Sequence, residues 1–84
     1  MSFAPRLEHD PEADAVYVYL SPHEESARTQ CLDDLRMVDY GPTGELVGVE
    51  LLHVSGGVDL TGVPEAITVQ RLLAEYGIPI RIGV

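Results

Sequence analysis

The chain has 84 residues and a mass of 9.1 kDa, which leaves room for a single small domain (1–84) because two separate cores could not both be filled. Its formal charge is −9, and this excess of negative charge argues against a nucleic-acid partner. Hydrophobic residues make up 45% of the sequence, which excludes a disordered chain and predicts a folded core.

The segment at the N-terminus is predicted to form a β-hairpin. Strands are expected at 6–9 and 15–20, joined by a turn in which Asp10 supplies the acceptor and Pro11 the fixed φ of a type I turn. In the second strand, Val16, Val18 and Leu20 lie on one face. The other face carries Ala15, Tyr17 and Tyr19, so both faces carry apolar groups.

Three more strands are expected at 26–32, 35–40 and 45–54. The turn at 41–44 joins the last two, and Gly44 is predicted to adopt a positive φ there. Asp39, at the end of its strand, is expected to cap the following turn. In the last strand, Val47, Val49 and Leu51 lie on one face and the other face also carries leucines, so both faces of the sheet are predicted to carry apolar groups.

The hydrophobic period changes after residue 60. A helix is predicted at about 64–76, ended by Gly77, and the isoleucines of 78–84 alternate as in an extended tail that needs burial on this sheet or in a neighbouring chain. The predicted fold class is therefore α+β: an antiparallel β-meander of four to five strands (about 6–54), one C-terminal helix and a short extended tail.

Two stretches resemble a known family. They are DPEADAVYVYL at 10–20 and VDYGPTGELVGVELL at 38–52, and together they resemble the prokaryotic domain-of-unknown-function family 2283. The resemblance implies a small meander sheet with a helix, and it implies no reaction, cofactor or catalytic residue. Some members look like neighbours of small toxin-like proteins.

Metal-binding chemistry has little support in the sequence. Asp10, Glu12 and Asp14 alternate like calcium ligands, but the glycine and glutamate that a calcium loop requires at its sixth and twelfth positions are missing. His9 and His53 would approach each other only if the first and last strands paired. We therefore predict no metal and no cofactor.

Glu50 is the polar residue that the pattern singles out, because it lies between Val49 and Leu51 in the most apolar strand. A buried carboxylate needs a partner, which Tyr17, Tyr19, Arg28 or Arg36 could supply. The candidate functional cluster is Glu50, Tyr17 and His53. A structural role for Glu50 is the competing interpretation.

No spacing of serine, cysteine or histidine matches a known catalytic motif, so no catalytic residue is assigned and an enzyme is disfavoured. The two apolar sheet faces favour a non-catalytic protein-interaction module that forms a homodimer. The alternatives are an antitoxin-like acidic partner of a small basic protein, and a small-molecule binder or enzyme that uses the Glu/Tyr cluster in a dimer cleft.

The compartment is predicted from cysteine usage and from the hydropathy of the chain. Cys31 is the only cysteine and cannot form an intrachain disulfide, which favours a reducing compartment. Residues 1–6 lack the features of a signal peptide, and no apolar stretch approaches the roughly 18 residues of a membrane span. A cytoplasmic location without membrane association is expected.

Overall fold

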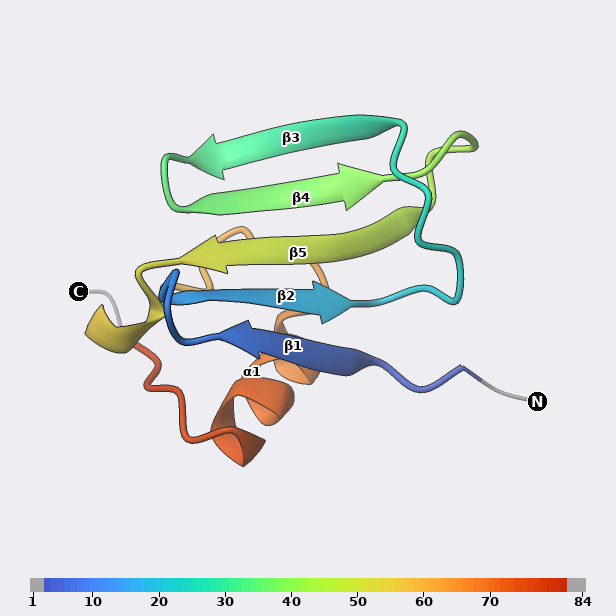
Figure 1. Ribbon diagram of the computed structural model, residues 1–84. Coiled ribbons are helices and arrows are strands. Elements are labelled where there is room, and N and C mark those ends of the chain that lie inside the picture. Colours follow the sequence, from blue (N-terminus) through green and yellow to red (C-terminus); the bar gives the residue numbers. More distant parts are fainter. Residues whose placement is uncertain (1–2, 82–84) are drawn as a thin grey trace.

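A computed structural model describes residues 3–81 of the chain and contains a single sheet, a short 3-10 helix and one α-helix (Figure 1). The elements, in chain order, are β1 (Arg6–Asp10), β2 (Ala15–Tyr19), β3 (Arg28–Asp33), β4 (Arg36–Tyr40), β5 (Leu46–Leu52), η1 (Val54–Gly56) and α1 (Ala66–Glu75). The predicted α+β class, with a five-stranded antiparallel sheet and one C-terminal helix, is confirmed.

The strand order is β1-β2-β5-β4-β3, so an N-terminal hairpin lies beside a three-stranded meander. The long connection between β2 and β3 passes the end of the sheet and allows β5 to pair with β2 (Figure 1). At the first turn, the Asp10 carboxylate accepts a hydrogen bond from the Ala13 amide at 3.2 Å, as predicted. Gly44 has the expected positive φ of 85° in the turn before β5.

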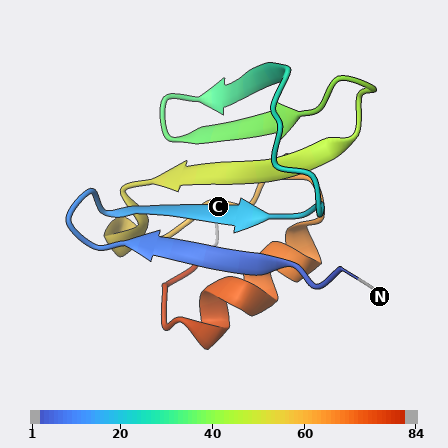
Figure 2. The same ribbon diagram turned by 45° about the vertical axis from the view of Figure 1, so that its right-hand side comes forward.

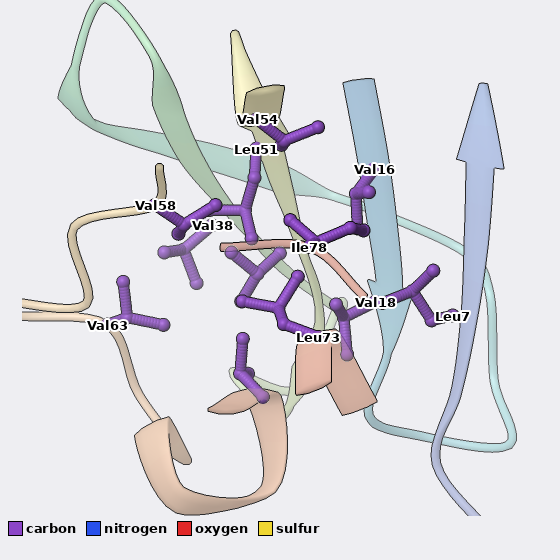
Figure 3. Packing of buried hydrophobic residues seen from close by; sticks show 12 residues of the cluster. Leu7, Val16, Val18, Val38, Leu51, Val54, Val58, Val63, Leu73 and Ile78 are labelled. Carbon is purple, nitrogen blue, oxygen red and sulfur yellow. The ribbon is translucent and has the colours of Figure 1, made fainter. Parts of the chain in front are cut away.

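Alternate strand residues form a dry core beneath one side of the sheet, which we call the covered face (Figure 3). Its buried side chains from the strands are Leu7, Val16, Val18, Val38, Val49 and Leu51. Val18 and Val49 pair directly across β2 and β5, and each is fully buried. Burying a valine contributes roughly 1.5 to 3 kcal/mol relative to leaving it exposed, so this face supplies most of the stabilising contacts.

α1 lies against the covered face and within the predicted range 64–76 (Figure 2). It inserts Val69 and Leu73, both fully buried, into the core. The helix begins after Glu65, whose φ of 54° is left-handed, and it ends before Gly77, which adopts a φ of 69° as expected for a helix stop. No helix among residues 3–81 is long and apolar enough to cross a membrane.

The start of the predicted tail belongs to the same core. Ile78 is 6% exposed, and Ile80 forms a parallel bridge with Val58 and packs on the core cluster. The burial that these two isoleucines need is therefore supplied within the chain. Ile82, the third predicted member, lies outside the described residues.

Candidate functional site

The opposite side of the sheet carries no helix, and we call it the open face. Its residues are Arg6, Glu8, Asp10, Ala15, Tyr17, Tyr19, Thr29, Cys31, Met37, Asp39, Gly48, Glu50 and Leu52. The prediction that both faces carry apolar groups is met only in part on this side. Met37, Leu52 and the tyrosine rings are half-buried here, and they alternate with carboxylates and an arginine.

Tyr17 is the centre of the open face. Its hydroxyl donates a 2.8 Å hydrogen bond to Asp39 Oδ2, although β5 lies between β2 and β4. The ring can cross β5 because the residue beneath it is Gly48: a Cβ there would lie 2.6 Å from Tyr17 Cε1 and 2.5 Å from the Val18 carbonyl oxygen. Gly48 on β5 therefore leaves the space through which Tyr17 on β2 reaches Asp39 on β4.

Asp39 joins three strands. Its Oδ1 accepts a 2.5 Å hydrogen bond from the Thr29 hydroxyl on β3, and its Oδ2 accepts the bond from Tyr17 on β2. The prediction that Asp39 caps the turn after its strand is therefore wrong, because its side chain points across the sheet. Burial raises the pKa of Tyr17, and the hydrogen bond to Asp39 raises it further, so the ring stays protonated well above neutral pH.

Arg6, Glu8 and Tyr19 form a second cluster beside the first. The Arg6 guanidinium lies 3.8 Å from the centroid of the Tyr19 ring and forms 3.1 Å ion pairs with Glu8 and Glu24. The Tyr19 hydroxyl donates to Glu8 at 2.8 Å, which lowers the pKa of Glu8 and raises that of Tyr19. An aromatic face and two carboxylates therefore hold one guanidinium on this surface.

Glu50 and Tyr17 are direct partners across β5 and β2, so two of the three predicted site residues are neighbours. Glu50 is exposed rather than buried, and Tyr17 donates to Asp39 instead. His53 follows the strand with a left-handed φ of 54°, which ends β5 at Leu52 rather than at the predicted Val54. His53 is exposed, and it does not line the open depression that lies beside Glu50.

The other partners suggested for Glu50 are also engaged elsewhere. Tyr19 bonds to Glu8, and Arg36 forms a 2.9 Å ion pair with Asp33. The guanidinium of Arg28 lies 4.4 Å from the centroid of the Tyr40 ring. Because Glu50 is exposed, its carboxylate faces solvent and needs no partner within the chain.

The open depression beside Glu50 has a volume of about 610 Å³ and lies at the end of the open face nearest the first turn. Glu8, Asp10 and Glu50 border it, Tyr17 and Leu52 form part of its wall, and the small side chain of Ala15 leaves space between them. Because Glu8 is paired with Arg6, Asp10 and Glu50 are the carboxylates that give this depression its negative character.

Asp14 makes a contact between distant segments that the sequence pattern did not predict. Its backbone is left-handed (φ 53°), and its carboxylate accepts hydrogen bonds from the Ser55 amide at 2.9 Å and hydroxyl at 2.6 Å. These bonds lower the pKa of Asp14 and tie the first turn to η1. The aspartate directly before a strand, 41 residues from its serine, gave no local signal of this contact.

The histidines are not brought together by strand pairing, because β2 lies between β1 and β5. Within residues 3–81 no group of three or more histidine, cysteine or acidic side chains has the arrangement of a metal site.

A sequence profile for proteins of unknown function, DUF2283, matches residues 6–55, which is more than half of the chain. The chain belongs to this family. The match covers all five strands and ends at Ser55, so the family region includes Tyr17, Gly48 and Asp39 as well as the Asp14–Ser55 contact. No match is found among curated proteins or among solved structures.

Proposed function

We propose that this member of the DUF2283 family is a non-catalytic protein-interaction module that works as a homodimer. The observation that carries the proposal is the half-covered sheet: α1 shelters one face, while the open face and the outer strand β3 are accessible to another molecule (Figures 1 and 2). A small domain of 84 residues gains stability from a partner, because it buries a modest share of its surface alone.

The hydrogen bonding of the open face supports a non-catalytic role. The hydroxyls of Tyr17, Tyr19 and Thr29 each donate to a carboxylate, so these groups stabilise the surface of the sheet. Burial and the bond to Asp39 raise the pKa of Tyr17, so its hydroxyl keeps its proton at neutral pH and is a poor nucleophile. A cytoplasmic setting is part of the proposal, since Cys31 is a free, exposed thiol.

The mass of the protein in solution tests the proposal. Light scattering on the purified chain at tens of micromolar is expected to give twice the 9.1 kDa of one chain. A mass equal to one chain across that concentration range would overturn it.

A second candidate function is the binding of a small basic protein. The specific observation is that Arg6 already shows how this surface holds a guanidinium, between the Tyr19 ring and two carboxylates. The adjacent depression offers the Tyr17 ring with Asp10 and Glu50, and no arginine lines it. An arginine from a partner would fit this chemistry, and the net charge of −9 would speed its approach.

Titration with a short arginine-rich peptide tests this second function. Binding that weakens several-fold in Glu50→Gln, and that weakens further with added salt, is the expected result. An unchanged affinity in Glu50→Gln would place the peptide elsewhere and reject the depression as its site. The alternative of a small-molecule site is tested by a thermal-shift screen of metabolites. A rise in melting temperature with one of them would favour that alternative.

A further inference from the structure

The strand β3 forms one margin of the sheet, and no other element lies beyond it in either view (Figures 1 and 2). Five of its six residues are exposed, and only Leu32 is partly buried. An edge strand carries a row of backbone N–H and C=O groups without partners, which can template the addition of another strand.

The two edge strands of this sheet are protected to different degrees. On β1, charged residues occupy every open-face position, Arg6, Glu8 and Asp10, and Pro5 precedes the strand. Such charges and prolines are the usual means of blocking edge-to-edge association. On β3 the four central residues from Thr29 to Leu32 are uncharged, so this edge lacks that protection.

The charges at the ends of β3 are opposite in sign, with Arg28 at the start and Asp33 at the end. An antiparallel pair of identical strands places the start of each beside the end of the other, so these charges become complementary. Among the ion pairs of residues 3–81, none involves Arg28. Asp33 is paired with Arg36 through Oδ2, but its side chain is 47% exposed and can take a second cation.

The bulge in β3 brings the two charges to one face. Gln30 pairs with Val38, which faces the core, so Arg28 and Gln30 lie on the helix side of the sheet. The register shifts between Cys31 and Asp33, and Asp33 therefore pairs with Arg36 on that same side. When Gln30 faces its own copy, Thr29 faces Cys31, and Arg28 falls opposite the bulge that contains Asp33.

We propose that two copies of this chain join their β3 strands in antiparallel register about a two-fold axis at Gln30, forming one continuous sheet with two symmetric Arg28–Asp33 contacts. This inference rests on the proposed homodimer and assigns its interface. The open faces of the two copies then lie on the same side and form one extended surface, while both helices lie on the other.

Charge substitution at the axis provides the main test. Gln30 is exposed, and a charge there would face its own copy within about 5 Å, where like charges are destabilising. Gln30→Lys and Gln30→Glu are each expected to lose the dimer and scatter as single chains. An equimolar mixture of the two is expected to recover the doubled mass, because lysine then faces glutamate.

Gln70→Lys is the matched control, since it makes the same substitution at an exposed position of α1, outside β3 and the depression. It is expected to remain a dimer. If the unmodified chain is a dimer and both Gln30 variants also remain dimers, the β3 interface is wrong while the proposed function stands. If the unmodified chain is monomeric, the proposed function fails and this interface fails with it.

Oxidative cross-linking tests the register. In the proposed register Thr29→Cys would face Cys31 of the other copy, and opposite residues have Cα atoms about 4.5 to 5.5 Å apart, which a disulfide can span. Copies of Cys31 are offset by two residues, or about 7 Å along the strand, which is too far. Thr29→Cys should therefore form covalent dimers, whereas the unmodified chain and Thr29→Cys/Cys31→Ser should not. A bridge formed by Cys31 alone would overturn the Gln30 register.

Discussion

The covered face and the open face are drawn from alternate residues of the same strands, yet they are stabilised in different ways. On the covered face, aliphatic side chains such as Val49 exclude water and are held by dispersion and the hydrophobic effect. On the open face, Tyr17 and Asp39 are held by a hydrogen bond at partial exposure. The comparison teaches that a sheet can satisfy an uncovered side with aromatic and carboxylate pairs rather than with a second layer.

The largest expected effect is on the covered face. Leu73→Ala removes a fully buried side chain from α1 and leaves a cavity, so we expect the free energy of unfolding to fall by about 2 to 5 kcal/mol. Ile67→Ala, on the same helix but 77% exposed, is the matched control and should change it little. Urea denaturation measures both. Equal losses in the two variants would contradict the assignment of the core.

The next effect is at Gly48, where the Tyr17 ring of β2 crosses β5. Gly48→Ala places a Cβ against the Tyr17 ring and the Val18 carbonyl, so we expect a loss of roughly 1 to 3 kcal/mol. Gly56→Ala is the control, because nothing lies within 4 Å of the Cβ it would add. Thermal unfolding followed by circular dichroism compares them, and a Gly48→Ala variant as stable as Gly56→Ala would refute the close approach.

A smaller effect is expected from the hydrogen bond itself. Tyr17→Phe keeps the ring over Gly48 and removes the bond to Asp39, which should cost about 1 kcal/mol. The pKa of Tyr17 is raised above its ordinary value of 10.0, so the contribution is complete below about pH 10 and is lost as the pH rises through the folded pKa. Unfolding curves at increasing alkaline pH should therefore converge for Tyr17→Phe and the unmodified chain. Parallel curves would show that the hydroxyl does not titrate in this way.

The smallest effect is expected at the tie between the first turn and η1. Asp14→Asn keeps a residue that tolerates the left-handed backbone and removes the charge that accepts from Ser55, so the melting temperature should fall modestly at neutral pH. Because the pKa of Asp14 lies below its ordinary value of 3.8, the stabilisation is present above about pH 4 and is lost on further acidification. The difference between the two proteins should shrink in acid. A difference that grows would reverse the assigned sign.

The alternation in the sequence predicted the covered face well because burial follows a period of two along a strand. Val16 and Val18 were assigned to one face of their strand, Val49 and Leu51 to one face of theirs, and all four are buried. The same alternation could not say what the other face does with its residues. Glu50, assigned to burial by its apolar neighbours, is exposed because no layer covers that side.

Two residues of the predicted cluster lie side by side. Glu50 and Tyr17 are neighbours, since both lie on predicted strands that pair, whereas His53 follows the end of β5 with a left-handed backbone and does not line the depression beside Glu50. The partner of Tyr17 could not be predicted, because Asp39 lies two strands away and the register of β4 is needed to place it.

The sequence by itself determined the fold class, the hairpin at Asp10–Asp14 and the position of the helix, because turn chemistry and hydrophobic period are local properties of the chain. Only the tertiary structure decided the strand order, the crossing of Tyr17 over Gly48 and the contact of Asp14 with Ser55. These features depend on strand pairing between distant segments, and the free energy that selects one pairing is shared among many contacts that no short segment contains.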